Sequence, residues 1–410
     1  MVAVALVLLA LMLGWLLRPQ RAVGFLLNRV GTALGLEITA SGNAEYRLRG
    51  TPQLVIRDVV ARQPGAKTPV LRARRLLLAL PWSTLRARGA DLTVTRIELD
   101  APVFDLSAFQ RWQATRPHSE TRIPTLTRGL RIRDGVVAND DWRMQGLAID
   151  IAELHPDRLL RMRVRGRYLA SPLSVPADLA IAVANPARLA KGAASGVAGV
   201  GALAFAGADW RVPSRVTLSG PLRLGKDSAL IRPMAFGMAA RYESADTRVP
   251  LVLGLHGPMA FNNATWRVVP MQAVLRGGET VPNLRGRGSL SLGRRLVLHL
   301  DGSIAAWPTG WPVLPSPLSQ STSPLPFALD YAGRMDLADV ASLALQRDET
   351  RFDARFRTAD VTTWANADAQ DSPLPPLTGR LRSPRLEIAG ATMEGVEMEL
   401  DDPDLPPATR

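Results

Sequence analysis

The feature that most constrains this chain is the alternation of apolar and polar residues, which dominates from residue 36 onward. The clearest example is the run Leu160, Arg161, Met162, Arg163, Val164, Arg165, Gly166, Arg167. Successive side chains of a β-strand point to opposite faces, so this pattern is typical of an antiparallel sheet with one wet face. Similar segments recur roughly every dozen residues between Gly, Pro, Asn and Asp. The sequence therefore predicts a mostly β protein.

A few short segments depart from the alternation. Residues 106–112 and 336–345 have helical spacing and predict short helices. Asp134-Gly135 follows the alternating segment 130–133 and predicts a hairpin turn, because this dipeptide favours tight turns between strands. A final hairpin is predicted around Gly390.

A short motif occurs twice near the start of the β region. Residues 56–61 read Ile-Arg-Asp-Val-Val-Ala, and residues 132–138 read Ile-Arg-Asp-Gly-Val-Val-Ala. An internal duplication and a chance match in a chain rich in Arg, Val and Ala both explain this pair.

Changes in composition suggest where the chain divides. Residues 185–208 are nearly all small, and residues 306–326 are rich in proline. The expected regions are a transmembrane anchor (1–18), an amphipathic helix (20–35), an N-terminal β region (36–184), a middle β region with small-residue and Pro-rich loops (185–368), and a C-terminal hairpin with an acidic tail (369–410).

The N-terminal segment carries no charge from residue 2 to residue 17. At ~1.5 Å per residue it nearly spans a bilayer core, so we expect an uncleaved membrane anchor. A cleaved signal peptide and a core helix are the alternatives, but Arg-Pro follows the segment where a signal peptidase prefers small residues. The anchor positions are Val2, Leu6, Leu9, Leu13, Trp15 and Leu17.

The next segment has the spacing of a short amphipathic helix. Its apolar stripe consists of Val23, Leu26, Leu27, Val30 and Leu34. Gly35 follows the stripe and is the predicted C-cap. Such a helix can close the end of a β core or lie on a membrane surface.

The residues that usually carry catalysis or bind metals are scarce. The chain has no cysteine and only four histidines, which are far apart in the sequence. His299 alternates with Leu298 and Leu300, as a solvent-facing strand residue would. We therefore predict neither a metal site nor a cofactor, and we do not expect an enzyme.

The charge is strongly basic. Fifty Lys and Arg against 37 Asp and Glu give a net charge of +13, and nearly all of the basic residues are arginine. A GC-rich genome and an anionic partner both explain this bias. Nucleic acid is not the expected partner, because aromatic residues make up only 5% of the chain and are not interleaved with arginine on one face.

Several segments carry a resemblance to a known family: Thr51–Val60, Val70–Leu80, Pro81–Leu85, Leu92–Phe104, Leu130–Val137 and Pro384–Val396. With the apolar N-terminus, they resemble the opening and closing elements of the AsmA-like family, which are inner-membrane-anchored periplasmic proteins of Gram-negative bacteria. The family has no catalytic motif to transfer to this chain.

The resemblance implies a fold and a function. The implied fold is a curled antiparallel β-sheet related to bridge-like lipid-transfer proteins. Alternation alone fits an open β-groove and a flattened sandwich equally well. The implied function is phospholipid binding or transfer in envelope and outer-membrane biogenesis. The alternative is a non-enzymatic scaffold for assembling outer-membrane proteins or a secretion system, with envelope proteins as partners.

Topology and lipid-facing positions complete these expectations. Basic residues after the anchor would by themselves favour a cytoplasmic body, whereas the resemblance implies a single-pass inner-membrane protein with most of the chain in the periplasm. The candidate apolar, lipid-facing positions are Leu54, Ile56, Leu130, Ile132, Met162 and Val164.

Overall fold

The computed structural model describes residues 31–32, 35–86, 93–115, 123–171, 173–207, 209–225, 228–245, 247–279, 281–309, 323–335, 337–366, 376–388 and 391–406. The predicted anchor and most of the predicted amphipathic helix lie outside these residues. None of the helices in this described part is long and apolar enough to cross a membrane.

The predicted C-cap at Gly35 is confirmed. The Leu36 N–H donates to the carbonyl of Gly31 (2.8 Å), and the Gly35 N–H donates to the carbonyl of Thr32 (3.2 Å). This pair of bonds is a Schellman motif, and Gly35 has the positive φ of 60° that the motif requires.

The fold is mostly β, as the alternation predicts. Twenty-two strands belong to one curled, mostly antiparallel sheet, and β5 (Thr93–Val94) and β8 (Thr125–Leu126) form a separate parallel pair. Residues 1–211 and 212–410 form two compact units, which are described in turn.

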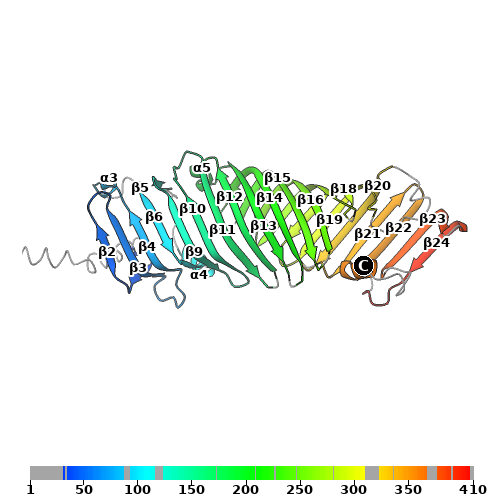
Figure 1. The fold of residues 1–410 in the computed structure, drawn as a ribbon, viewed down its shortest axis with the longest axis horizontal. Coiled ribbons are helices and arrows are strands. Elements are labelled where there is room, and N and C mark those ends of the chain that lie inside the picture. The colour runs from blue at the N-terminus through cyan, green and yellow to red at the C-terminus, as the bar shows by residue number, and fades with distance from the viewer. Residues whose placement is uncertain are drawn as a thin grey trace, which may run out of the picture. The chain divides into compact units, whose positions relative to one another are not determined.

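The first unit contains the strands β1 (Glu37–Ala40), β2 (Ala44–Arg47), β3 (Gln53–Arg62), β4 (Leu71–Ala79), β6 (Arg96–Asp100), β7 (Val103–Asp105), β9 (Leu130–Ala138), β10 (Arg143–Ile151), β11 (Leu160–Ala170), β12 (Leu173–Val183) and β13 (Ser195–Ala206). β1 and β2 both pair with β3, and the order continues through β4, then β6 and β7, to β9. From β9 to β13 each strand pairs with the next along the chain (Figure 1).

Three helices described in this unit connect strands: α3 (Trp82–Arg86), α4 (Leu106–Ala114) and α5 (Pro186–Ala190). The prediction of a helix at 106–112 is confirmed by α4. Its N-cap is Asp105, whose carboxylate accepts a hydrogen bond from the Ala108 N–H at 2.6 Å. α4 lies in the connection between β7 and β9, which run parallel and therefore need a crossover rather than a hairpin.

The hairpin turn predicted at Asp134-Gly135 is wrong. β9 continues through both residues to Ala138, and Asp134 takes a positive φ of 51° within the strand. Ile132 pairs with Ile149 of β10, and Gly135 pairs with Leu147. The segment between these pairs is therefore one residue longer on β9 than on β10, which makes a β-bulge. Asp58 in the matching motif of β3 also has a φ of 51°, so the two copies share a backbone conformation.

The small-residue stretch is not a break in the sheet. Most of it forms α5 and β13, and β13 pairs with β12 over most of its length. Alanine and glycine have weak β propensity, so the composition of this segment does not predict a strand. Its pairing with β12 makes it one.

The second unit contains β14 (Arg211–Leu224), which begins at its boundary, then β15 (Ser228–Ser244), β16 (Thr247–Asn262), β17 (Thr265–Gly277), β18 (Asn283–Leu292), β19 (Leu296–Ala306), β20 (Leu325–Gly333), β21 (Val340–Arg347), β22 (Thr350–Arg357), α6 (Thr358–Asn366), β23 (Thr378–Ile388) and β24 (Ala391–Leu400). From β15 to β24 each strand is antiparallel to its neighbours in chain order.

One prediction in this unit is confirmed and one is wrong. The final hairpin is formed by β23 and β24, which pair up to Ile388 and Ala391. The helix predicted at 336–345 is largely strand β21, which pairs with both β20 and β22. Its apolar residues satisfy helical spacing and strand alternation alike, and the two neighbouring strands decide the outcome.

A repeat in this unit was not predicted. Gly220-Pro221 recurs 37 residues later as Gly257-Pro258, and Pro233-Met234 recurs at the same spacing as Pro270-Met271. The pairing registers of β15, β16 and β17 shift beside these sites, which marks a β-bulge at equivalent places in successive strands.

Candidate functional site

The strands β9 to β13 have one apolar face and one polar face. Residues directly opposite each other in an antiparallel pair share a face, so the register defines both. The apolar face contains Leu130 and Ile132 of β9, Ile149 and Ile151 of β10, Met162 and Val164 of β11, Leu179 and Ile181 of β12, and Val197 and Gly199 of β13. The arginines of β9 and β11 lie on the opposite face.

This apolar face is buried near both ends of its strands, where Leu147 and Val175 at one end are 8% and 7% exposed. The other end is covered by a cluster that includes α5. Ile151, Leu160 and Val183 are buried there, and Leu189 of α5 packs against them. Between the two ends, Val164 and its partners remain half-buried. The strip therefore has an apolar floor without a protein layer that buries it fully.

Four of the six predicted lipid-facing residues lie together on this face. Leu130 and Ile132 come from β9, and Met162 and Val164 come from β11; these two strands lie on either side of β10. Their positions follow from the alternation that predicted them.

The other two predicted residues lie elsewhere. Leu54 and Ile56 are on β3 and belong to a separate cluster around Val59. Ile56 is only 1% exposed, so it is a core residue and its side chain has no surface for a ligand. Alternation identifies the face of a residue but not whether the protein already covers that face.

The second unit has a longer apolar face that the sequence did not nominate. Across β15 to β24 the directly paired residues include Phe236, Met238, Leu253, Leu255, Leu275, Leu284, Ile304, Phe327, Leu345, Phe352, Leu381 and Met398. Leu253, Leu275 and Leu284 are half-buried. Alternation is visible in the sequence of each strand, but only the pairing register shows that the apolar residues of these strands form one surface.

Ion pairs occupy the polar face. The Arg163 guanidinium donates two hydrogen bonds to Asp178 on the next strand, at 2.9 and 2.7 Å. These bonds hold the pKa of Asp178 below its usual value, against a smaller opposing effect of desolvation. Both side chains are exposed, so the pair orients charges more than it stabilises the fold.

His299 lies on the polar face of the second unit, as predicted. Its Nδ1 is 2.6 Å from Asp330 and its Nε2 is 2.9 Å from Asp301. The hydrogen bond with Asp330 is the main cause of a pKa raised above 6.5, because both carboxylates favour the charged ring. In the described part of the chain, no group of three or more His, Asp or Glu side chains is placed to hold a metal ion.

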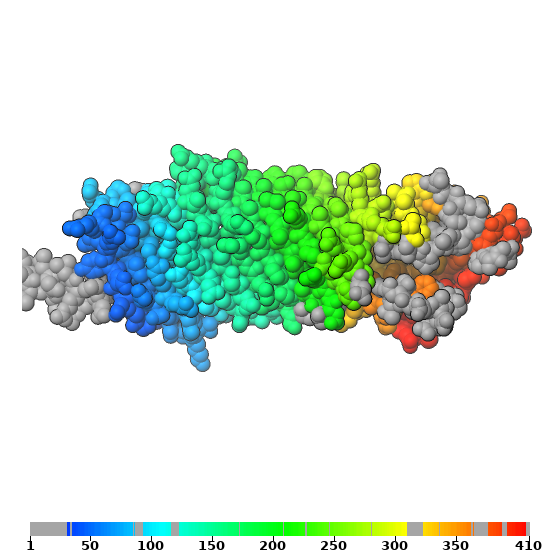
Figure 2. Space-filling model, viewed as in Figure 1, coloured from blue at the N-terminus to red at the C-terminus, as the bar shows by residue number. Residues whose placement is uncertain are grey.

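Side chains fill the gaps between the ribbons of Figure 1. In the space-filling view, the described residues of β3 to β13 close the visible face of the sheet (Figure 2). The sheet therefore separates the space on its apolar side from the space on its polar side.

No protein-family model, curated protein or solved structure matches this chain. The site is therefore interpreted from its own residues: a broad apolar face, partly uncovered, backed by a charged face. Such an arrangement suits contact with long apolar molecules rather than chemistry on a small polar one.

Proposed function

We propose that this is a membrane-anchored periplasmic protein that binds or transfers phospholipid, with acyl chains lying along the apolar face of the curled sheet. The observation that carries the proposal is an apolar face that spans many neighbouring strands and is only half-buried at Leu253, Leu275 and Leu284. Farther along, Ile304, Phe327 and Leu345 are 5–6% exposed, so protein covers that part. Leaving such a face in water costs about 25 cal/mol per Å², and an acyl chain would remove that cost without requiring hydrogen bonds.

The degree of burial favours a groove over a filled sandwich. Large apolar side chains facing a packed interior are usually almost inaccessible, because interiors are packed as densely as organic crystals. In the described residues, the large side chains with less than about 2% exposure are Ile56, Met234, Met271 and Leu386. By the register, Met234 and Met271 belong to the apolar face of the second unit, so protein covers that face there. Val164 in the first unit and Leu253 in the second remain half-buried.

The proposed location rests on the sequence. The uncharged segment 2–17 would hold the protein at the inner membrane. The resemblance to the AsmA-like family supports a periplasmic sheet. The arginines of the polar face would then lie within reach of anionic head groups, which attract basic surfaces.

Photocrosslinking tests the proposed lipid contact. A photoreactive residue at Leu253, on the apolar face of β16, or at Val164 of β11, should crosslink to phospholipid when the full chain is illuminated in membranes. The matched control is Val252, the neighbour of Leu253, which is 52% exposed and pairs with Arg276 on the polar face. Equal labelling at Leu253 and Val252, or none at either apolar position, would contradict the proposal.

A further inference from the structure

The polar face of β9 to β13 is hollowed. The hollow has a volume of about 690 Å³. Its small lining residues include Ala148 of β10, Ala180 and Ala182 of β12, and Ala198 of β13. The register places Ala180 opposite Arg163 and Ala182 opposite Arg161, so small side chains stand where larger ones would fill the space. Its arginines and alanines belong to the polar face, and residues of the apolar face, Ile132, Ile149, Met162 and Ile181, also border it.

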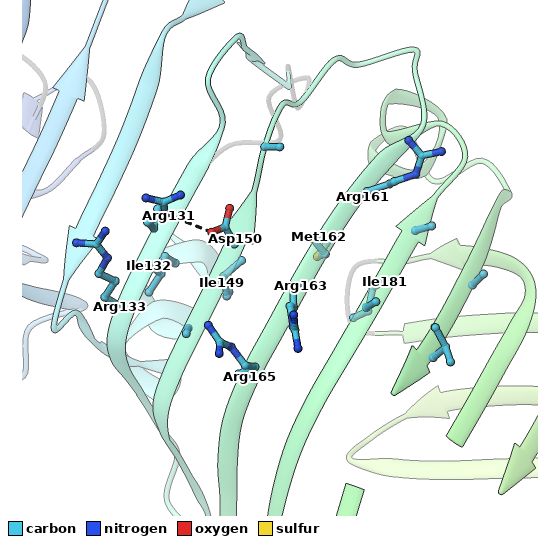
Figure 3. Close-up of a pocket in the computed structure, with 17 residues that line it drawn as sticks. Arg131, Ile132, Arg133, Ile149, Asp150, Arg161, Met162, Arg163, Arg165 and Ile181 are labelled. Atoms are coloured by element: carbon cyan, nitrogen blue, oxygen red, sulfur yellow. Dashed lines mark hydrogen bonds and ion pairs between the residues drawn. The ribbon is translucent and has the colours of Figure 1, made fainter. Parts of the chain in front are cut away.

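Arginines from two strands surround this floor. Arg131 and Arg133 come from β9, and Arg161, Arg163 and Arg165 come from β11 (Figure 3). The three on β11 occupy every second position, which puts neighbouring guanidinium stems about 7 Å apart on one face.

Carboxylates neutralise only part of this charge. Asp150 pairs with Arg131 at 3.3 Å, and Asp178 pairs with Arg163 at 2.7 Å. Arg165 stands opposite Asp178 and also lowers the pKa of that carboxyl, so it shares this carboxylate with Arg163. Arg133 and Arg161 form no side-chain ion pair within the described residues. Five guanidinium groups therefore face two carboxylates around one hollow. The five-donor forks of the arginines match the oxygens of a phosphate.

We propose that this hollow binds the phosphate of an anionic amphiphile, namely a phospholipid head group, through Arg133, Arg161 and Arg165. Free phosphate would satisfy the same guanidinium groups. The floor favours the lipid, because alanine methyl groups and Val200, which is 55% exposed, offer apolar contact beside the charge. The three arginines and the alanines belong to the polar face of the sheet, so their substitutions test this site separately from the acyl-chain surface.

Calorimetry on the full chain in neutral maltoside micelles tests this site. The probes are dihexanoyl phosphatidylglycerol, dihexanoyl phosphatidylcholine and inorganic phosphate. We expect the anionic lipid to bind more tightly than the other two. In the double variant Arg161→Gln/Arg165→Gln, binding of phosphatidylglycerol should weaken about 30-fold, because each arginine near anionic lipid contributes on the order of fivefold.

Two further variants separate a built site from general positive charge. Arg285→Gln/Arg287→Gln removes two exposed arginines from one face of β18 and should leave binding unchanged. Ala180→Leu keeps the charge but fills the hollow, so it should weaken binding. Equal losses from both arginine pairs, or no loss from Arg161→Gln/Arg165→Gln, would overturn the site.

The probes also identify the ligand. Phosphate binding as tightly as phosphatidylglycerol would overturn the assignment to a lipid. Loss of photocrosslinking at Leu253 with intact phosphatidylglycerol preference would instead count against the acyl-chain surface alone, so the two proposals fail in different ways.

Discussion

Replacing Leu275 by glutamate should sharply weaken phospholipid binding by the full chain. Leu275 is half-buried on the apolar face of β17, directly between Leu253 of β16 and Leu284 of β18. A carboxylate there would have to leave water without a partner when an acyl chain covers it, which costs several kcal/mol. We expect the dissociation constant of a fluorescent phospholipid to rise at least about tenfold.

The matched control is Val274→Glu at the neighbouring position. Val274 lies on the polar face and pairs with Arg285, so a glutamate there gains an opposite charge and stays in water. Circular dichroism of both variants checks that each retains its β structure. Equal weakening by the two substitutions, or no weakening by Leu275→Glu in a folded protein, would contradict an acyl-chain surface.

Replacing Gly288 by alanine should destabilise the second unit. A β-carbon added at Gly288 of β18 would stand 1.8 Å from the carbonyl oxygen of His299 in the paired strand β19. That oxygen belongs to the main chain and cannot rotate away, so the two strands would have to separate locally. We expect the free energy of unfolding to fall by about 1–3 kcal/mol in urea titrations.

Gly254→Ala provides the comparison. Gly254 also lies within a strand of the second unit, but a β-carbon there would meet nothing within 4 Å. Alanine restricts the unfolded chain more than glycine does, so this variant should be neutral or more stable by about 0.5 kcal/mol. A similar loss in both variants would show that close approach at Gly288 does not explain its effect.

Much of this fold follows from local sequence because the dominant signal, alternation, is local. It identified most strands and the final hairpin, and helical spacing, which is equally local, identified α4. It failed where one segment fits two structures: Asp134-Gly135 suits a turn and a bulge, and residues 340–347 suit a helix and a strand. In both cases the pairing with neighbouring strands decided the structure, and the sequence of the segment alone does not show which strands it pairs with.

The residues of the candidate site also fall into two groups, those that local alternation predicts and those that depend on other strands. Met162 and Val164 were identified because alternation places them on an apolar face. The buried state of Ile56 depends on Ile38 and Ala44 from other strands, which no local pattern reveals. The arginine hollow was also missed, since its floor forms only when the alanines of β12 come opposite the arginines of β11.

The central claim is that phospholipid, rather than further protein, covers the half-buried apolar face. Mass spectrometry of the full chain, extracted from its membrane in a mild neutral detergent and washed extensively, tests it most directly. We predict that phospholipid remains bound to the wild-type chain in at least equimolar amount and is depleted in Leu275→Glu. A folded wild-type chain that carries no phospholipid would contradict the claim.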